Sequence, residues 1–530
     1  MKTRQINPRW NTVWLLTVVC VISMAPLARA DDAGRRAVDE TRRALRQQGF
    51  KTELADFDFS TSPELRAREA ILNATDPYRH YSPIVILQSL MEGVGTNSAI
   101  VVWKLNSVKG KFPWPDRKEE FTWDDFRKAI NTNQARLDDA CAAILAGPIR
   151  FNLEVTPTGI MLPFSFPRLG LLNYFAGVFG KRTVLAVHDG DLNTAWTNLM
   201  AVTRLVTAWE PEPADEAHIT RFQNTALAFN ALWQALQTNG WPDDKLSRLQ
   251  TEWESVDFFA NLPETAAFKR ARYVALCQQE RKGLLDSRPP LAVFVEGAFQ
   301  MPSWLWSELN RRWEQTNYSK SGAWEDEKAL LLFYRDREVE LRKAAQAQTW
   351  FAMRQLPGVT NIPSFQSKHR SLMHSMLSSH ELTIQTELRN EGSTLLGRAA
   401  MAEAQRRLII VALALERYRG KHGWYPSTLS ELTPKFLKNP LTDFVNGQPL
   451  HYHPTDDGHF ILYSVGLDGV DYGGQMASRN WIGPPCNFSA RSKADIVWPL
   501  PATTAAVEAL HAVEAKPRKQ GGKGFLRGGK

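Results

Sequence analysis

Residues 408–432, LIIVALALERYRGKHGWYPSTLSEL, contain the sharpest change of pattern in the chain. Apolar side chains recur at helical spacing as far as Tyr418, and the basic residues that follow suit the negative end of a helix dipole. Gly423 allows a left-handed stop, and Pro426 prevents the helix from continuing. A long helix therefore ends here, and a different kind of structure follows.

Downstream of this stop the sequence alternates between apolar and polar residues. Two such stretches, 449–453 and 459–464, flank the turn sequence PTDDG at 454–458, which predicts a β-hairpin. One face of the hairpin carries Leu450, Tyr452, Phe460 and Leu462. That face should pack on the preceding helix. We therefore expect a small α+β domain over residues 391–501.

Upstream, from residue 31 to about 390, the dominant period is helical. Helical patterns cover residues 31–49, 122–144, 171–188, 191–209, 214–238, 242–259, 266–285, 323–350 and 391–422. Thr122 precedes two acidic residues, as an N-cap does, and residues 149–155 alternate like a short strand. The expected fold class is mainly α, with a large all-α region at 31–390 followed by the α+β domain.

The N-terminus has the three-part layout of a secretory signal peptide. Three basic residues precede an apolar run at 13–24, and Ala28-Arg29-Ala30 supplies small residues at the cleavage positions before Asp31. The run is shorter than the roughly 20 residues that a bilayer span needs. We expect residues 1–30 to be removed and the mature protein to be periplasmic or extracellular, without a stable transmembrane span. The alternative is an uncleaved membrane anchor.

The net charge of +8 comes from the two ends of the chain. Residues 1–30 hold four basic residues and no acid, whereas residues 31–501 hold equal numbers of basic and acidic residues. The pI near 9.2 therefore does not indicate a nucleic-acid-binding body. Residues 502–530 form a basic tail that ends in Gly, Lys and Arg, and we expect this tail to be disordered.

Cys141, Cys277 and Cys486 remain after signal removal. Their number is odd and their spacing wide, which favours buried thiols over a disulfide framework or a metal site. One disulfide among the three stays possible in an oxidising compartment.

Six blocks of sequence occur, in order, between about residues 408 and 474. After the helix come HGWYP (422–426), LSEL (429–432), NPLTD (439–443), NGQPLHY (446–452) and LYSVGLDG (462–469). Together they resemble the globular head of the major pseudopilins of bacterial type II secretion (protein G). Pseudopilins begin with a prepilin cleavage site and an apolar helix that leads straight into the head. Here the head lies some 400 residues into the chain, which implies a head reused in a secreted protein.

The resemblance implies a calcium site in the loop DGVDYGG at 468–474. In that family the corresponding loop binds calcium, and the carry-over gives Asp468 and Asp471 as ligands. Calcium prefers oxygen ligands from carboxylates and carbonyls. The alternative is a turn in which the two Asp side chains accept hydrogen bonds from backbone amides. Calcium is the one cofactor that we expect.

Histidines provide a second metal candidate. If residue 453 pairs with residue 459, then His451, His453 and His459 share one strand face and could bind zinc. The alternative is an exposed polar face. A further group, His369, His374 and His380, does not share one helical face and is typical of ordinary surface or core.

We expect an exported, non-enzymatic protein whose C-terminal module binds or assembles with envelope or secretion proteins. The first alternative is a periplasmic hydrolase that uses acids of the helical region. The candidate acids are Glu264, Asp286, Glu325 and Asp326. The second alternative is a helical scaffold that binds protein partners. No nucleotide-binding, nucleophile-elbow or zinc-protease motif occurs in the sequence.

Overall fold

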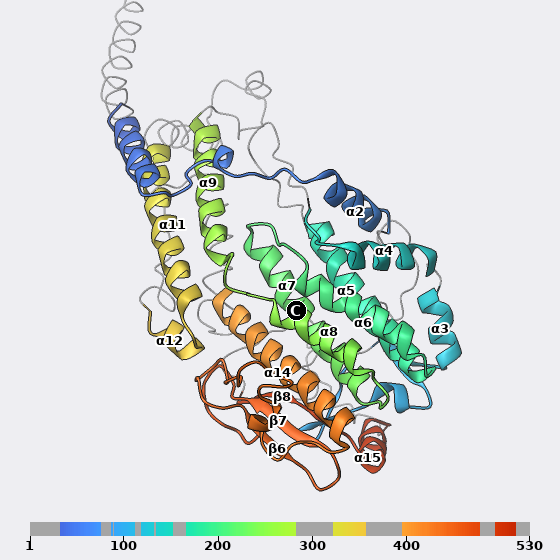
Figure 1. Ribbon diagram of the computed structural model, residues 1–530. Helices are drawn as coiled ribbons and strands as arrows, with labels where there is room; N and C mark the ends of the chain where they lie inside the picture. The colour runs from blue at the N-terminus through green and yellow to red at the C-terminus, as the bar shows by residue number, and fades with distance from the viewer. Residues whose placement is uncertain are drawn as a thin grey trace, which may run out of the picture.

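The fold is mainly helical, with three small three-stranded sheets (Figure 1). The computed structural model describes residues 32–75, 86–87, 90–111, 118–131, 134–151, 166–281, 322–356, 395–476 and 493–515. A helix covers residues 32–47. The later helices are α2 (Pro63–Ala74), α3 (Trp123–Asn131), α4 (Gln134–Ala146), α5 (Phe166–His188), α6 (Leu192–Thr207), α7 (Asp215–Leu236), α8 (Asp243–Glu254), α9 (Leu262–Arg281), α11 (Ala323–Gln346), α12 (Trp350–Arg354), α14 (Leu395–His422) and α15 (Thr504–Ala515).

The described residues also contain short 3₁₀ turns and strands. The turns are η1 (Leu54–Asp56), η2 (Val102–Lys104) and η5 (Leu429–Leu432). The strands are β1 (Ile86–Leu87), β2 (Gly93–Val94), β3 (Ser98–Ala99), β4 (Val108–Lys111), β5 (Lys118–Phe121), β6 (His451–Pro454), β7 (Phe460–Ser464), β8 (Ile496–Trp498) and β9 (Leu500–Pro501). The sheets have the orders β1-β4-β5, β2-β3-β9 and β6-β7-β8.

The expectation of an all-α region at 31–390 is wrong in one segment. Strands β1 to β5 lie between residues 86 and 121. They are two to four residues long, too short for an alternating pattern to be recognised in the sequence. One of them, β3, pairs in parallel with β9, some 400 residues later, and a pairing over that separation leaves no local signal.

Helix termini follow the local chemistry of the sequence. The Thr122 hydroxyl accepts a hydrogen bond from the amide of Asp125 (3.1 Å), as an N-cap does. Asp191 caps α6 by accepting from the amides of Asn193 and Thr194 (3.1 and 3.0 Å). The single helical pattern predicted at 122–144 corresponds to two helices in the structure, α3 and α4.

Two other local predictions need correction. Pro242 is the N-cap residue of α8 and not part of its first turn, and α8 ends at Glu254, five residues before the predicted end. In the predicted strand 149–155, Ile149 forms an isolated bridge with Trp209, and residues 152–155 lie outside the described residues.

The main core joins the helical body to the C-terminal elements. Helices α5, α6 and α7 pack on one another, and α14 packs against α7 and α8. Gln234 of α7 donates to the carbonyls of Leu90 and Ile100 (2.7 and 2.9 Å). The neighbouring Trp233 donates to the carbonyl of Pro499 (2.7 Å). One continuous apolar cluster therefore spans both sides of residue 390.

Below α14 lies the sheet β6-β7-β8 (Figure 1). Leu450, Phe460 and Leu462 of the predicted apolar face are buried, and Tyr452 is half-buried. The third strand, β8, pairs with β7 and was not expected, because it follows β7 by some 30 residues. Its Trp498 contacts Phe229 of α7 edge-on at 5.0 Å between ring centroids.

The tail prediction is wrong for its first part. Residues 504–515 form α15, whose sequence, TAAVEALHAVEA, is rich in helix-forming residues. Val507 and Leu510 of α15 are buried with Val94 and Ile100. Only residues 516–530 have the Gly-, Lys- and Arg-rich composition on which the expectation of disorder depends. Residues 516–530 lie outside the described residues.

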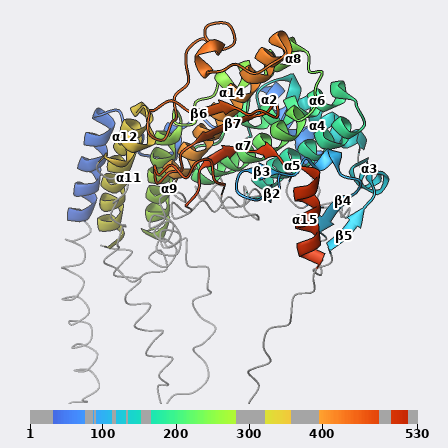
Figure 2. The same ribbon diagram turned by 90° about the horizontal axis from the view of Figure 1, so that it is seen from below.

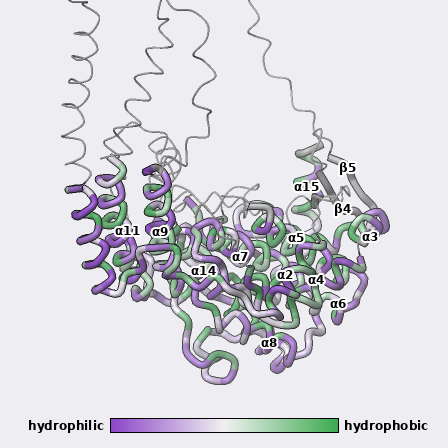
Figure 3. Tube along the Cα trace, turned by 90° about the horizontal axis from the view of Figure 1, so that it is seen from above, coloured by the Kyte–Doolittle hydropathy of each residue, from purple (hydrophilic) through white to green (hydrophobic). Residues whose placement is uncertain are grey.

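A three-helix lobe is formed by the 32–47 helix, α9 and α11, which run side by side at one end of the molecule (Figures 1 and 2). Figure 3 shows hydrophilic colour along the 32–47 helix, beside α11. Within the described residues, no helix combines the length and apolar character that a bilayer span needs. The predicted signal peptide, residues 1–30, lies outside them.

Candidate functional site

The predicted calcium loop is closed by hydrogen bonds to its own carboxylates. Asp468 accepts from the amide of Val470 and from the hydroxyl of Tyr472, both at 3.1 Å. Asp471 accepts from the amide of Gly473 (2.8 Å) and from the hydroxyl of Tyr463 on β7 (3.1 Å). Bonds of this type, from a carboxylate to an amide two residues on, belong to an Asx turn.

A third carboxylate, which the sequence analysis missed, completes this loop. Asp495 leads into β8 and is 3% exposed. It accepts from the amides of Tyr472 (3.1 Å) and Gly474 (2.8 Å). Burial raises the pKa of Asp495. The pairing of β7 with β8 brings Asp495 to this loop. The spacing of residues in the sequence does not predict this contact.

The described residues of this loop do not form a cluster of metal ligands. No group of three His, Cys, Asp or Glu side chains that could hold a metal ion occurs in the described part of the chain. The observed bonds are those of the alternative, a turn held by its own Asp side chains. Each carboxylate can still offer lone pairs to a cation, because every oxygen can accept more than one bond.

The histidine register differs from the assumed one. His453 pairs with Ile461, and the amide of Thr455 bonds to the carbonyl of His459 (2.9 Å). The assumption that residue 453 pairs with 459 is therefore wrong, because the five-residue turn covers 455–459 and lies one residue later in the chain than expected. His451 stacks on Tyr463 at 4.5 Å between ring centroids. Its Nδ1 lies 3.7 Å from a carboxylate oxygen of Asp471. The group 369, 374 and 380 lies outside the described residues.

Asp443 organises the segment before the hairpin. Its side chain is fully buried and accepts from the hydroxyl of Ser464 (2.7 Å) and from the amides of Val445 and Val465 (2.8 and 2.9 Å). Burial raises the pKa of Asp443, although these bonds oppose the rise. This aspartate belongs to the block NPLTD of the resemblance, and its position ties that block to the end of β7.

The two described cysteines are buried. Cys141 of α4 and Cys277 of α9 are both buried, and no disulfide joins them. Burial raises the pKa of the Cys141 thiol to about 11, which makes it a poor nucleophile near neutral pH. Cys486 lies outside the described residues.

The acids proposed for a hydrolase occupy ordinary positions. Glu264 pairs with Lys51 (2.7 Å), and Glu325 and Asp326 lie in the first turn of α11, where acids suit the helix dipole. Asp286 lies outside the described residues. None of the three described acids, Glu264, Glu325 and Asp326, lines the cavity that lies between α6 and α8.

Two other glutamates have strongly perturbed acidity. Burial raises the pKa of Glu212, in the loop before α7, to about 7. Burial likewise raises the pKa of Glu416 on α14 to about 7. Glu416 accepts from the hydroxyl of Tyr425 (2.6 Å) and pairs with Arg419 (2.6 Å). The raised pKa of both glutamates is explained by their burial inside the fold.

Comparison of the chain with models of protein families, with curated proteins and with solved structures found no match.

Proposed function

We propose that this protein is exported and non-enzymatic, and that its C-terminal module binds envelope or secretion proteins. The module comprises α14 and the elements that follow it as far as residue 501. The proposal draws on the signal-like residues 1–30 and on the ordered blocks that resemble a pseudopilin head. Export would bring the module to the compartment where its partners lie.

The observation that carries the proposal is the burial of α14. Its residues from Leu395 to Leu415 pack mostly inside the protein, against α7 and α8. Arg406 donates to the carbonyl of Trp253 (2.9 Å), and Arg407 donates to that of Thr442 (2.7 Å). The helix that would correspond to a pseudopilin stem therefore packs against other helices of this same chain. This supports binding by a fixed head over assembly through the stem.

Among its described residues, the module exposes two large apolar side chains. Trp424 follows α14 and is 66% exposed, and Val470 in the 468–474 loop is 48% exposed. Scattered apolar residues are normal on a surface, so these two positions need a direct test. Ile71 of α2, 40% exposed, provides a matched control outside the module.

Site-specific photocrosslinking of the full chain in intact cells tests the proposal. The photoreactive residue p-benzoylphenylalanine replaces Trp424, Val470 or Ile71, one at a time. We expect discrete adducts with envelope proteins from positions 424 and 470 and none from position 71. N-terminal sequencing of the same material should begin at Asp31. A cytosolic product that keeps residues 1–30, or adducts equally strong at all three positions, would contradict the proposal.

We also propose, from the resemblance, that the 468–474 loop takes up calcium through Asp468 and Asp471. Millimolar calcium should raise the melting temperature by a few degrees, because a ligand that binds only the folded state stabilises it by about 1–3 kcal/mol when in excess. Asp468→Ala should abolish the rise. Asp457→Ala, in the hairpin turn, should retain it. An unchanged melting temperature of the unsubstituted protein in calcium would end this part of the proposal.

A further inference from the structure

A half-open cavity of about 510 Å³ lies between α6 and α8, a volume within the range of small-molecule sites; Arg248, Thr251 and Ser255 are exposed at it. Trp196 and Arg204 of α6 and Arg248 and Glu252 of α8 contribute its aromatic and charged walls. Leu145 of α4 belongs to its apolar part. The cavity is outside the C-terminal module, so nothing in the proposed function accounts for it.

Most of the charge in this cavity is already paired. Arg204 pairs with Glu252 (3.0 Å) and also donates to the carbonyl of Ile144 (3.1 Å). The second carboxylate oxygen of Glu252 accepts from the hydroxyl of Thr207 (3.0 Å). The Arg204–Glu252 pair is therefore satisfied within the protein and adds no net charge to the cavity.

Arg248 is the charge that remains. Its guanidinium lies over the ring of Trp196, 4.8 Å from the ring centroid, and it has no carboxylate partner among the described residues. The indole covers one face of the guanidinium and restrains its orientation. The planar N–H edge of such a group suits two-point binding of a carboxylate or a phosphate.

Hydroxyl groups from α8 line the same cavity at helical spacing. Ser247, Thr251 and Ser255 are four residues apart and so lie on one face of the helix. The hydroxyls of Thr251 and Ser255 donate to carbonyls of their own chain, of Ser247 (3.0 Å) and Glu252 (2.7 Å). Their lone pairs remain free to accept hydrogen bonds from a ligand.

We propose that this cavity binds a small hydroxylated molecule that carries one carboxylate or phosphate group, of the size of a sugar acid or a sugar phosphate. Arg248 binds the anionic group, and the α8 hydroxyls accept hydrogen bonds from the hydroxyls of the ligand. Met200 and Leu145 contact its carbon skeleton.

Calorimetric titration of the full-length protein tests this proposal. The probes are glucuronate and glucose 6-phosphate, with glucose and inorganic phosphate as controls. We expect saturable binding of at least one anionic sugar, with glucose and phosphate each at least about tenfold weaker, because each lacks one of the two interactions. The two anionic probes distinguish the carboxylate from the phosphate.

Substitutions tie the binding to the cavity. Arg248→Gln should weaken it about tenfold or more, and Thr251→Trp should block it by filling the space. Arg36→Gln, an exposed arginine of the 32–47 helix, should leave it unchanged. The proposal would be overturned if neither glucuronate nor glucose 6-phosphate binds at 10 mM, which corresponds to a binding free energy of roughly −2.7 kcal/mol or weaker. Equal loss of binding in the Arg248 and Arg36 variants would also overturn it.

Discussion

Helices α14 and α11 are both long, with 28 and 24 residues, but they are held in place by different interactions. In α14, 20 residues are buried, and most are Ala, Leu, Ile or Val. In α11, nine residues are buried, and three of these are the acids Asp326, Glu327 and Glu338. α14 is stabilised mainly by apolar burial, whereas α11 depends on ion pairs inside the three-helix lobe.

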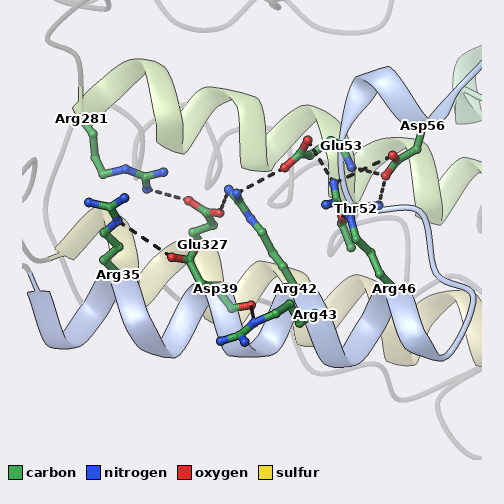
Figure 4. A network of polar contacts seen from close by, with 10 residues as sticks. All are labelled: Arg35, Asp39, Arg42, Arg43, Arg46, Thr52, Glu53, Asp56, Arg281 and Glu327. Atoms are coloured by element: carbon green, nitrogen blue, oxygen red, sulfur yellow. Dashed lines mark hydrogen bonds and ion pairs between the residues drawn. The ribbon is translucent and has the colours of Figure 1, made fainter.

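The ion pairs of the lobe connect all of its helices (Figure 4). The fully buried Glu327 of α11 binds Arg42 of the 32–47 helix and Arg281 of α9 (2.6 Å). Glu338 of α11 pairs with Arg270 of α9 (2.8 Å). Apolar burial is not directional, but ion pairs hold only in a defined geometry. We therefore expect the lobe to be more sensitive than α14 to the loss of one side chain.

The largest expected effect comes from Glu327→Gln. The change removes the carboxylate of Glu327 from Arg281 and leaves Arg42 paired with Glu53 (3.3 Å), and an uncompensated buried charge costs about 3–5 kcal/mol. Differential scanning calorimetry should show a clearly lower melting temperature. Lys328→Gln, the exposed neighbour, should change stability by less than about 0.5 kcal/mol.

A combined replacement sharpens this result. Arg42→Met, Arg281→Met and Glu327→Leu together remove every charge of the trio, and apolar side chains of similar volume often restore stability. Recovery toward the original melting temperature would show that unpaired charge causes the loss. If the triple variant is less stable than Glu327→Gln, the ion pairs contribute more than packing can replace.

A smaller loss is expected from Leu413→Ala in α14. Leu413 is fully buried in the main core, and a Leu→Ala change there costs about 3 kcal/mol, since the cavity closes only in part. Urea unfolding measures the change, with the exposed Lys421→Ala as control. A loss well above that of Glu327→Gln would reverse the ranking of the two regions.

The smallest expected effect depends on pH and concerns Glu416, which with Glu403 is one of two buried carboxylates of α14. Its pKa is raised from 4.5 to about 7, so between these values the folded state holds a proton that the unfolded state has lost. Stability should therefore fall by about 2–3 kcal/mol as pH rises from 4.5 to 7.

Melting temperatures measured across this pH range test the effect. Glu416→Gln should reduce the decline without abolishing it, because glutamine does not ionise whereas Glu212, whose pKa is also raised to about 7, still does. The exposed Glu431 provides a contrast: hydrogen bonds lower its pKa, so its contribution is lost as pH falls. Glu431→Gln should leave the decline between pH 5 and 7 in place. An equal slope in the Glu416 variant would contradict the assignment.

Several features of the fold could be predicted because neighbouring residues encode them. Asp191 and Thr122 begin helices through side chains that bond to amides two or three residues away. Gly423 ends α14 with φ of 87°. The buried face of the hairpin follows from alternation alone. In each case the partners lie within a few residues, so a local pattern contains the whole interaction.

Features that depend on distant partners could not be predicted in this way. The loop at 468–474 is completed by Asp495, and Gln234 joins α7 to the carbonyls of Leu90 and Ile100. Nothing near these residues in the sequence identifies the partner. The same holds for Arg42 and Glu327, which are 285 residues apart.

By itself the sequence determined where several helices begin or end, the stop at Gly423, and which side of the hairpin is buried. Those outcomes follow from backbone conformation and from the period of side chains along one element. Only the tertiary structure decided which charges meet inside the lobe, how β3 joins β9, and that Arg248 and Trp196 share a cavity. Such contacts depend on how helices and strands pack together, and packing depends on the shape and charge of whole surfaces.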